Sequence, residues 1–130
     1  MLIHHVTVDP VAKPRMTRRD KWAQRPAVLN YRAYADALRA ALPRGVRGGA
    51  FHLTFQLAMP RSWTKAKRAR MNGTPHKSKP DIDNLVKGVL DALMADDAHV
   101  WKVTAEKSWA EAGSVTIREL EAVARHEEAA

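Results

Sequence analysis

Side chains suited to metal chemistry are concentrated in one short run of this chain, Lys79–Lys87, which contains Asp81, Asp83 and Lys87. A second acidic pair, Asp96-Asp97, follows where the helix that starts in this run is expected to end. Carboxylate oxygens are the ligands that hard divalent cations such as Mg²⁺ prefer, and Mg²⁺ often joins a protein to phosphate groups. The pattern therefore indicates a metal site that faces a phosphate backbone.

Each of these residues also has an ordinary structural explanation. In an extended segment Asp81 and Asp83 can face one metal ion, but acidic residues also cap helices and complement the helix dipole. Lys87 can join a surface ladder of ion pairs with Asp83 and Asp91, or it can stabilise charge on a reacting phosphate. Asp96-Asp97 can support a turn or supply a third carboxylate. From the spacing alone, these alternatives stay open.

The charge is strongly polarised along the chain. Residues 1–80 hold 17 Lys and Arg against 3 acidic residues (+14), and residues 81–130 hold 5 against 11 (−6). Clustered basic residues and a pI of about 10.2 indicate a polyanionic partner. The predicted DNA contacts are Arg15, Arg18, Arg19, Lys65, Lys67, Arg68, Arg70, Lys77 and Lys79.

The four tryptophans fall into two groups. Trp22 and Trp63 lie among basic residues, the combination that tracks a nucleic-acid backbone while aromatic rings stack on bases or sugars. Trp101 and Trp109 lie an even number of residues apart in a predicted strand, so we expect them on one face, as core or interface residues.

Several classes of protein are disfavoured. The chain has no cysteine, and its six histidines show no metal-like spacing, so a zinc site is not indicated. It has no Gly-rich phosphate loop. No apolar stretch approaches the ~20 residues of a membrane span, and the first ten residues do not resemble a signal peptide. We therefore expect a cytoplasmic protein with no membrane partner.

The length indicates a single domain over residues 1–130, and we expect an α+β fold in which a small mixed sheet is packed by two main helices. Hydrophobic periodicity predicts the individual elements. The predicted helices span 27–42 and 81–94. The predicted strands span 2–8, 51–59, 100–105 (with a possible extension to 109) and 114–118. Residues 61–79 hold many basic residues and several chain breakers, which predicts a mobile basic loop, and residues 119–130 form an acidic tail.

The run Lys79–Lys87, followed by Leu90-Asp91-Ala92-Leu93 and Asp96-Asp97-Ala98-His99-Val100, resembles the RusA-type Holliday junction resolvases, small endodeoxyribonucleases common in prophages. The resemblance is close over residues 79–100 and looser before them. The combination of D-x-D-N, a lysine, D-A-L and D-D at this spacing is far more specific than any one of these pieces.

The resemblance implies a Mg²⁺ site, with Mn²⁺ as a substitute, formed by Asp81, Asp83 and Asp97. It implies that Lys87 contacts a phosphate or the transition state. We assign Asp91 a structural role. The implied enzyme is a homodimer that nicks opposed strands of four-way or branched DNA symmetrically, in DNA recombination and repair, and leaves 5′-phosphates.

The chain departs from the family pattern in three places. His99 stands where glutamine is more common, the basic segment before Pro80 is long, and the connection after Leu93 is short. The short connection leaves open whether Asp96 or Asp97 is the third ligand. Two alternative functions also remain: a nuclease acting on forks or flaps, and a basic DNA-binding accessory protein without catalysis.

Overall fold

The structure, a computed structural model, describes residues 2–15 and 25–121. Four strands form one sheet in the order β1-β4-β2-β3. Strand β2 pairs in parallel with β3 and antiparallel with β4, and β4 pairs antiparallel with β1, so the sheet is mixed. The strands are β1 (Leu2–Val6), β2 (Ala50–Ala58), β3 (Lys102–Ala110) and β4 (Ser114–Glu119).

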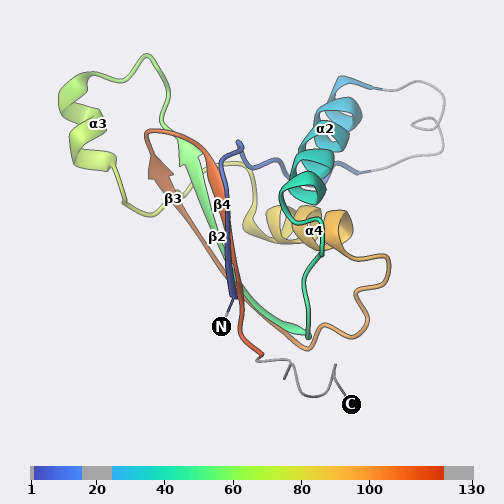
Figure 1. Ribbon diagram of the computed structural model, residues 1–130. Coiled ribbons are helices and arrows are strands. Elements are labelled where there is room, and N and C mark those ends of the chain that lie inside the picture. Colours follow the sequence, from blue (N-terminus) through green and yellow to red (C-terminus); the bar gives the residue numbers. More distant parts are fainter. Residues whose placement is uncertain (1, 16–24, 122–130) are drawn as a thin grey trace.

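In the described part of the chain, three helices accompany the sheet, namely α2 (Pro26–Ala41), α3 (Lys65–Met71) and α4 (Ile82–Leu93). Helices α2 and α4 lie on the same side of the sheet, and α3 stands apart, beyond the ends of β2 and β3 (Figure 1). The mixed sheet packed by two main helices confirms the predicted α+β fold class. No helix in the described ranges is both long enough and apolar enough to cross a bilayer.

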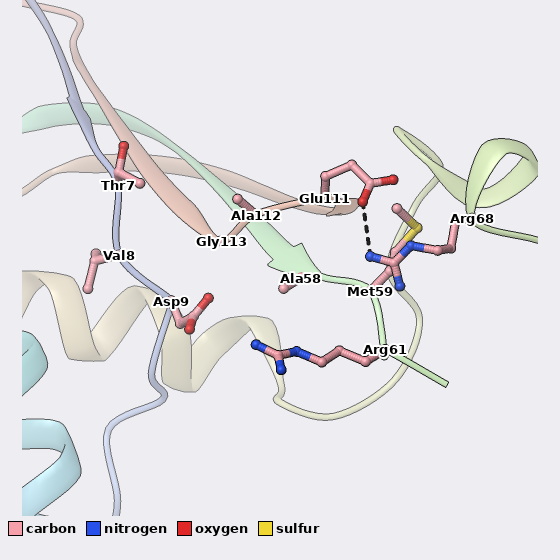
Figure 2. A pocket seen from close by; sticks show the side chains of 10 residues that line it. All are labelled: Thr7, Val8, Asp9, Ala58, Met59, Arg61, Arg68, Glu111, Ala112 and Gly113. Carbon is pink, nitrogen blue, oxygen red and sulfur yellow. Dashed lines mark hydrogen bonds and ion pairs between the residues drawn. The ribbon is translucent and has the colours of Figure 1, made fainter. Parts of the chain in front are cut away.

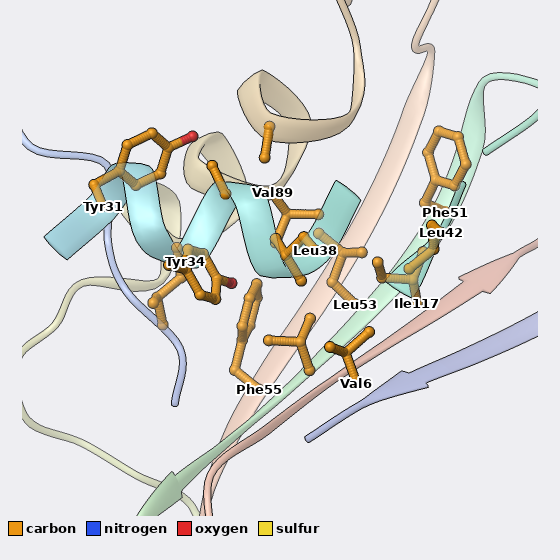
Figure 3. Close-up of a cluster of buried hydrophobic side chains, with 14 residues drawn as sticks. Val6, Tyr31, Tyr34, Leu38, Leu42, Phe51, Leu53, Phe55, Val89 and Ile117 are labelled. Atoms are coloured by element: carbon orange, nitrogen blue, oxygen red, sulfur yellow. The ribbon is translucent and has the colours of Figure 1, made fainter. Parts of the chain in front are cut away.

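The hydrophobic core lies between the sheet and the two main helices (Figure 3). Alternate residues of β2, Phe51, Leu53 and Phe55, are fully buried, as expected for a strand covered on one face. They belong to the same buried cluster as Leu38 of α2 and Leu85 of α4. Burial of the apolar stripe on α4 therefore fixes which way its polar side faces.

Helix α4 can pack closely because residue 88 is a glycine. A Cβ there would come within 3.0 Å of the Val11 carbonyl oxygen and within 3.3 Å of Tyr31 Cε1. The Tyr31 hydroxyl donates a hydrogen bond to the Gly88 carbonyl at 2.7 Å, and the Lys13 amide donates to the Asn84 carbonyl at 3.0 Å. The close approach thus links α2 and the segment after β1 to the first half of α4.

One predicted element needs correction. Residues 61–79 were predicted to form a loop, but they contain helix α3, which begins after Thr64, whose hydroxyl accepts a hydrogen bond from the Lys67 amide. The helix was missed because it has no apolar stripe, and apolar periodicity is the main helical signal in a sequence. None of the α3 residues is buried.

Trp101 also differs from the prediction. It precedes β3 instead of lying within it, and it is 69% exposed, so it is not a core residue, and the interface role stays a prediction. The indole N–H of Trp101 donates a hydrogen bond to the Glu121 carboxylate. Three residues named in the sequence analysis, Arg18, Arg19 and Trp22, lie outside the described residues, as does the acidic tail beyond Glu121.

We expect Leu85→Ala to lower the free energy of unfolding by about 2–4 kcal/mol, because it leaves a cavity where α4 meets the sheet. Leu29→Ala is the matched control, since Leu29 lies on α2 and is 46% exposed, and it should cost less than about 0.5 kcal/mol. Urea unfolding followed by circular dichroism measures both. Equal losses in the two variants would contradict the assigned packing of α4.

Candidate functional site

The first candidate ligand, Asp81, occupies the N-cap position of α4, with φ −69° and ψ 140°. Its carbonyl accepts the first helical hydrogen bond, from the Leu85 amide at 3.1 Å. Its carboxylate, however, makes no capping hydrogen bond within the described part of the chain. It lies 3.0 Å from the Lys79 ammonium instead. The ordinary capping role considered for this side chain is therefore not used.

Asp81 and Asp83 line the same open hollow, of about 530 Å³. Asp83 lies in the first turn of α4 and is exposed. The other residues that line the hollow are Lys77, Ser78, Lys79, Ile82 and Lys107. Two carboxylates are thus surrounded by three lysines, which suits a site where a cation and an anionic substrate meet.

Lys107 belongs to this hollow although the sequence analysis did not select it. It lies on β3, and its ammonium donates hydrogen bonds to the carbonyls of Ser78 at 2.5 Å and Pro80 at 2.7 Å. The sequence does contain one indication: Lys107 has the same strand alternation as Val103 and Ala105, which pack against the core, so a charged side chain lies on an otherwise apolar face. That signal does not say what the lysine touches.

Lys87 lies on the exposed side of α4, four residues after Asp83. The ladder of ion pairs, one of the two alternatives for Lys87, is not formed among the described residues, because Asp91 pairs with Lys13 at 3.4 Å and no ion pair of Lys87 is found there. The Lys13 ammonium also lies 4.7 Å from the centre of the Tyr31 ring. Asp91 therefore helps to anchor the segment after β1, which fits its expected structural role.

The acidic pair after α4 is divided between two roles. The Asp96 carboxylate accepts a hydrogen bond from the Ala98 amide at 2.9 Å, which is turn chemistry. The Asp97 side chain is exposed and has no hydrogen-bond partner among the residues described, while its carbonyl accepts from the Val100 amide. Of the two, Asp97 has the carboxylate that remains available.

Asp97 does not lie with the other two aspartates. Asp81 and Asp83 stand at the start of α4, and Asp97 follows its far end, after 12 helical residues or about 18 Å. The connection leaves that end and runs to the beginning of β3 (Figure 1). Within residues 2–15 and 25–121, no three His, Cys, Asp or Glu side chains are grouped as metal ligands.

The residues present nevertheless fit Mg²⁺ in part. This ion keeps several water molecules and is often bound by only one or two carboxylates together with substrate phosphates. Asp81 and Asp83 supply two hard oxygen donors on one hollow. The ion pair of Asp81 with Lys79 is exposed, so it contributes at most about 1 kcal/mol and leaves the carboxylate open to exchange.

The basic segment, residues 61–79, forms an arm that consists of α3 and the connections on either side of it. Its residues Lys77 and Lys79 line the hollow. Trp63 lies before α3, and its ring centre is 4.8 Å from that of Trp109 on β3, which in turn is 4.1 Å from His76. The Lys67 ammonium lies over Trp63, 4.3 Å from the ring centre. The aromatic ring of Trp63 joins the arm to the sheet, and its stacking on nucleic acid stays a prediction.

His76 is buried against Trp109, and its Nδ1 has no hydrogen-bond partner among the described residues. Burial lowers the pKa of His76 below its ordinary value of 6.5, and the nearby Lys107 ammonium lowers it further. The uncharged form is therefore favoured in the folded protein. Its main-chain amide donates to the Lys107 carbonyl at 3.0 Å, which ties this segment to β3.

Arg68 is turned toward the protein. Its guanidinium donates to the Pro60 carbonyl at 2.7 Å and pairs with Glu111 at 2.9 Å. Arg68 and Arg61 line a second hollow of about 340 Å³, opposite Asp9 (Figure 2). Gly113 packs tightly against Asp9 at this hollow, since a Cβ at residue 113 would lie 2.1 Å from an Asp9 carboxylate oxygen.

The remaining predicted DNA contacts are at the surface. Arg15, Lys65, Arg70, Lys77 and Lys79 are exposed, and Lys67 is half-buried. Lys65 and Arg70 have no ion pair or side-chain hydrogen bond to any described residue. These two side chains of α3 are therefore free to contact a phosphate.

A comparison with protein-family models matches residues 7–118 to the family described as endodeoxyribonuclease RusA. The chain belongs to the RusA endodeoxyribonuclease family. The match includes strands β2 and β3, nearly all of β4, the helices α2, α3 and α4 and the hollow at Asp81, and it confirms the resemblance drawn from residues 79–100. RusA membership makes the chain an endodeoxyribonuclease. No curated protein matches it.

On the arm of this RusA chain, Arg70→Ala should weaken DNA binding and lower the slope of log K against log salt by about 0.9, the loss of one phosphate contact. Its melting temperature should not change, because Arg70 has no partner among the described residues. Fluorescence anisotropy at several salt concentrations measures the slope.

Arg68→Ala is the matched control, two residues away on the same helix. It should cost about 1 kcal/mol of stability, through the lost contacts with Glu111 and Pro60, and change the salt slope less. If Arg68→Ala lowered the salt slope as much as Arg70→Ala and left the stability unchanged, its assignment as an anchor would be contradicted.

Proposed function

We propose that this protein is a Mg²⁺-dependent endodeoxyribonuclease that resolves four-way DNA junctions by paired nicks. The observation that carries the proposal is the pair of carboxylates, Asp81 and Asp83, in an open hollow surrounded by lysines. A purely structural acidic cap would use its oxygens on the helix amides, and the Asp81 carboxylate does not do so within the described residues.

Asp81 and Asp83 would hold the cation, which when bound activates water as a nucleophile and offsets charge on the phosphate. The protein side chains bind and orient the DNA. Lys77 and Lys79 line the hollow and can hold a phosphate at its rim. Lys87, whose charge is not taken up by Asp91, is available to stabilise negative charge that develops during cleavage.

We further propose that the active form is a homodimer in which Asp97 joins Asp81 and Asp83 from the second copy. Asp97 is exposed and follows the opposite end of α4 from that pair. In a dimer with a two-fold axis, every contact between residue i of one protomer and residue j of its partner occurs twice. An arrangement that brings Asp97 of one protomer to Asp81 and Asp83 of the other would therefore complete two equal sites. Two sites related in this way suit symmetric nicking of a four-way junction.

Two other functions are separable by experiment. A nuclease for forks or flaps would use the same carboxylates on a different DNA shape. A DNA-binding accessory protein would keep the basic arm but would not cut. Membership in an endodeoxyribonuclease family disfavours the second of these.

We expect the wild type to introduce paired nicks in a labelled four-way junction with Mg²⁺ and not with EDTA, and to leave matched linear duplex largely uncut. Asp83→Asn should lose cleavage by at least about 100-fold and keep junction binding, because it removes a metal oxygen and no phosphate contact. Millimolar Mg²⁺ should also raise the melting temperature of the wild type more than that of Asp83→Asn.

Gel electrophoresis of the cleaved junction and a thermal shift assay give the two readouts. Tight junction binding by the wild type without any nicking would instead identify an accessory protein. Preferred cutting of forks over four-way junctions would identify the other type of nuclease.

The shared site predicts that two inactive variants restore each other. A mixed dimer of Asp83→Asn and Asp97→Asn should contain one intact site and one doubly damaged site, and it should nick a single strand. Two differently tagged copies, co-expressed and purified through both tags, provide the mixed dimer for a nicking assay.

The matched control is a mixed dimer of Asp83→Asn and Asp81→Asn, in which both sites are damaged, so it should stay inactive. If each site were formed within one chain, both mixed dimers would be inactive. Light scattering that finds only a monomer at assay concentration would also overturn this arrangement.

A further inference from the structure

Lys107 occupies an unusual position for a charged residue. Successive residues of a strand point to opposite faces, so Lys107 shares its face with Val103, Ala105 and Trp109. Val103 and Ala105 pack against the hydrophobic core under the helices. A lysine that continues this apolar row is half-buried and needs hydrogen-bond partners for its ammonium.

Those partners are the main chain just before the candidate metal ligands. The ammonium donates to the carbonyls of Ser78 and Pro80, at 2.5 Å and 2.7 Å, which flank Lys79 and directly precede Asp81. An ammonium has three N–H donors, so these two bonds satisfy most of its capacity. No ion pair of Lys107 with a carboxylate of a described residue is present.

The strand holds the same segment again a few residues earlier. The Trp109 amide donates to the Thr74 carbonyl at 3.0 Å, and the Gly73 amide donates to the Trp109 carbonyl at 2.8 Å. The His76 amide donates to the Lys107 carbonyl at 3.0 Å. Main-chain bonds therefore attach residues 73–76 to β3, and the Lys107 side chain attaches residues 78–80.

Beyond Pro80 the chain enters α4, whose own hydrogen bonds hold it. The carbonyls at 78 and 80 are thus the last fixed points before the two aspartates. In an exposed segment with three lysines on one hollow, these bonds decide the direction in which the Asp81 backbone enters the helix. The positive charge also lies on the hollow that Asp81 and Asp83 line, where it offsets their mutual repulsion.

We propose that Lys107 is a positioning residue of the nuclease site, which holds the turn before α4 so that Asp81 and Asp83 face one hollow. This inference rests on the proposed metal-dependent cleavage for its effect on activity. Its structural part concerns the turn alone and does not depend on that function.

The first test is amide hydrogen exchange measured by NMR on Lys107→Met, which keeps the aliphatic stem and removes the donors. The Leu85 amide, bonded to the Asp81 carbonyl, reports on the start of α4. We expect its exchange to be about 10-fold faster in the variant, while core amides of β2 are unchanged. Lys107→Arg keeps a cationic donor and should recover most of the protection.

The matched control is Lys102→Met, on the same strand. Lys102 is exposed and has no side-chain partner among the described residues, so its variant should exchange like the wild type. Unchanged exchange at Leu85 in Lys107→Met would overturn the proposal whether or not the protein cleaves DNA. If Lys107→Met does not fold, Lys107→Gln and Lys107→Arg are compared instead. Stronger protection of the Leu85 amide in Lys107→Arg supports the proposal, and equal or weaker protection overturns it.

The second test is titration with Mn²⁺ followed by electron paramagnetic resonance. We expect Lys107→Met to bind Mn²⁺ about 10-fold more weakly, as is usual when a group that orients metal ligands is removed. In cleavage, kcat should fall while KM for DNA changes little. A raised KM with unchanged Mn²⁺ affinity would identify Lys107 as a phosphate contact instead and would overturn its positioning role.

Discussion

The packing of α4 against the sheet and α2 is the interaction on which the rest of this structure depends. Its apolar stripe, which includes Leu85 and Val89, is buried against the sheet and α2, so its other side must face outward. Gly88 allows the chain near Val11 to approach the helix closely. A glycine inside a helix costs about 1 kcal/mol relative to alanine, and close packing against the neighbouring main chain offsets that cost here.

Because α4 is seated in this way, its N-terminal end lies beside β3 and its C-terminal end lies away from it. The first end carries Asp81 and Asp83, next to the lysines of the preceding segment. This places fixed carboxylates where a positive main-chain end and several ammonium groups favour negative charge. The same surroundings would attract a phosphate backbone, so the proposed ligands for a cation and the proposed contacts for DNA occupy one surface.

The basic arm and the segment before Asp81 and Asp83, the proposed metal ligands, contact the same strand. Trp109 of β3 contacts both Trp63 near α3 and His76 before the hollow, and Lys107, two residues earlier, holds the turn before Asp81. The same strand therefore contacts both the basic arm and the segment that precedes the aspartates.

Much of this molecule is readable from its sequence. Apolar spacing of 3.6 predicts α4, and alternation predicts β2, because both elements bury one side, and local periodicity records which side. The run from Lys79 to Lys87, with Asp96-Asp97, is sufficient to indicate the family. These features are local, so a short stretch of sequence contains the information.

The tertiary structure alone decided the features that depend on residues distant in sequence. Lys107 reaches Ser78 and Pro80 across 29 and 27 positions, and no spacing rule predicts that contact. The arm that contains α3 has no apolar stripe, and Trp109 of strand β3 holds it through contact with Trp63. The separation of Asp97 from Asp83 follows from the length of a rigid helix, which sequence proximity conceals. Side chains close in sequence can lie at opposite ends of one element, and distant ones can share a hollow, because packing, not chain order, sets their positions.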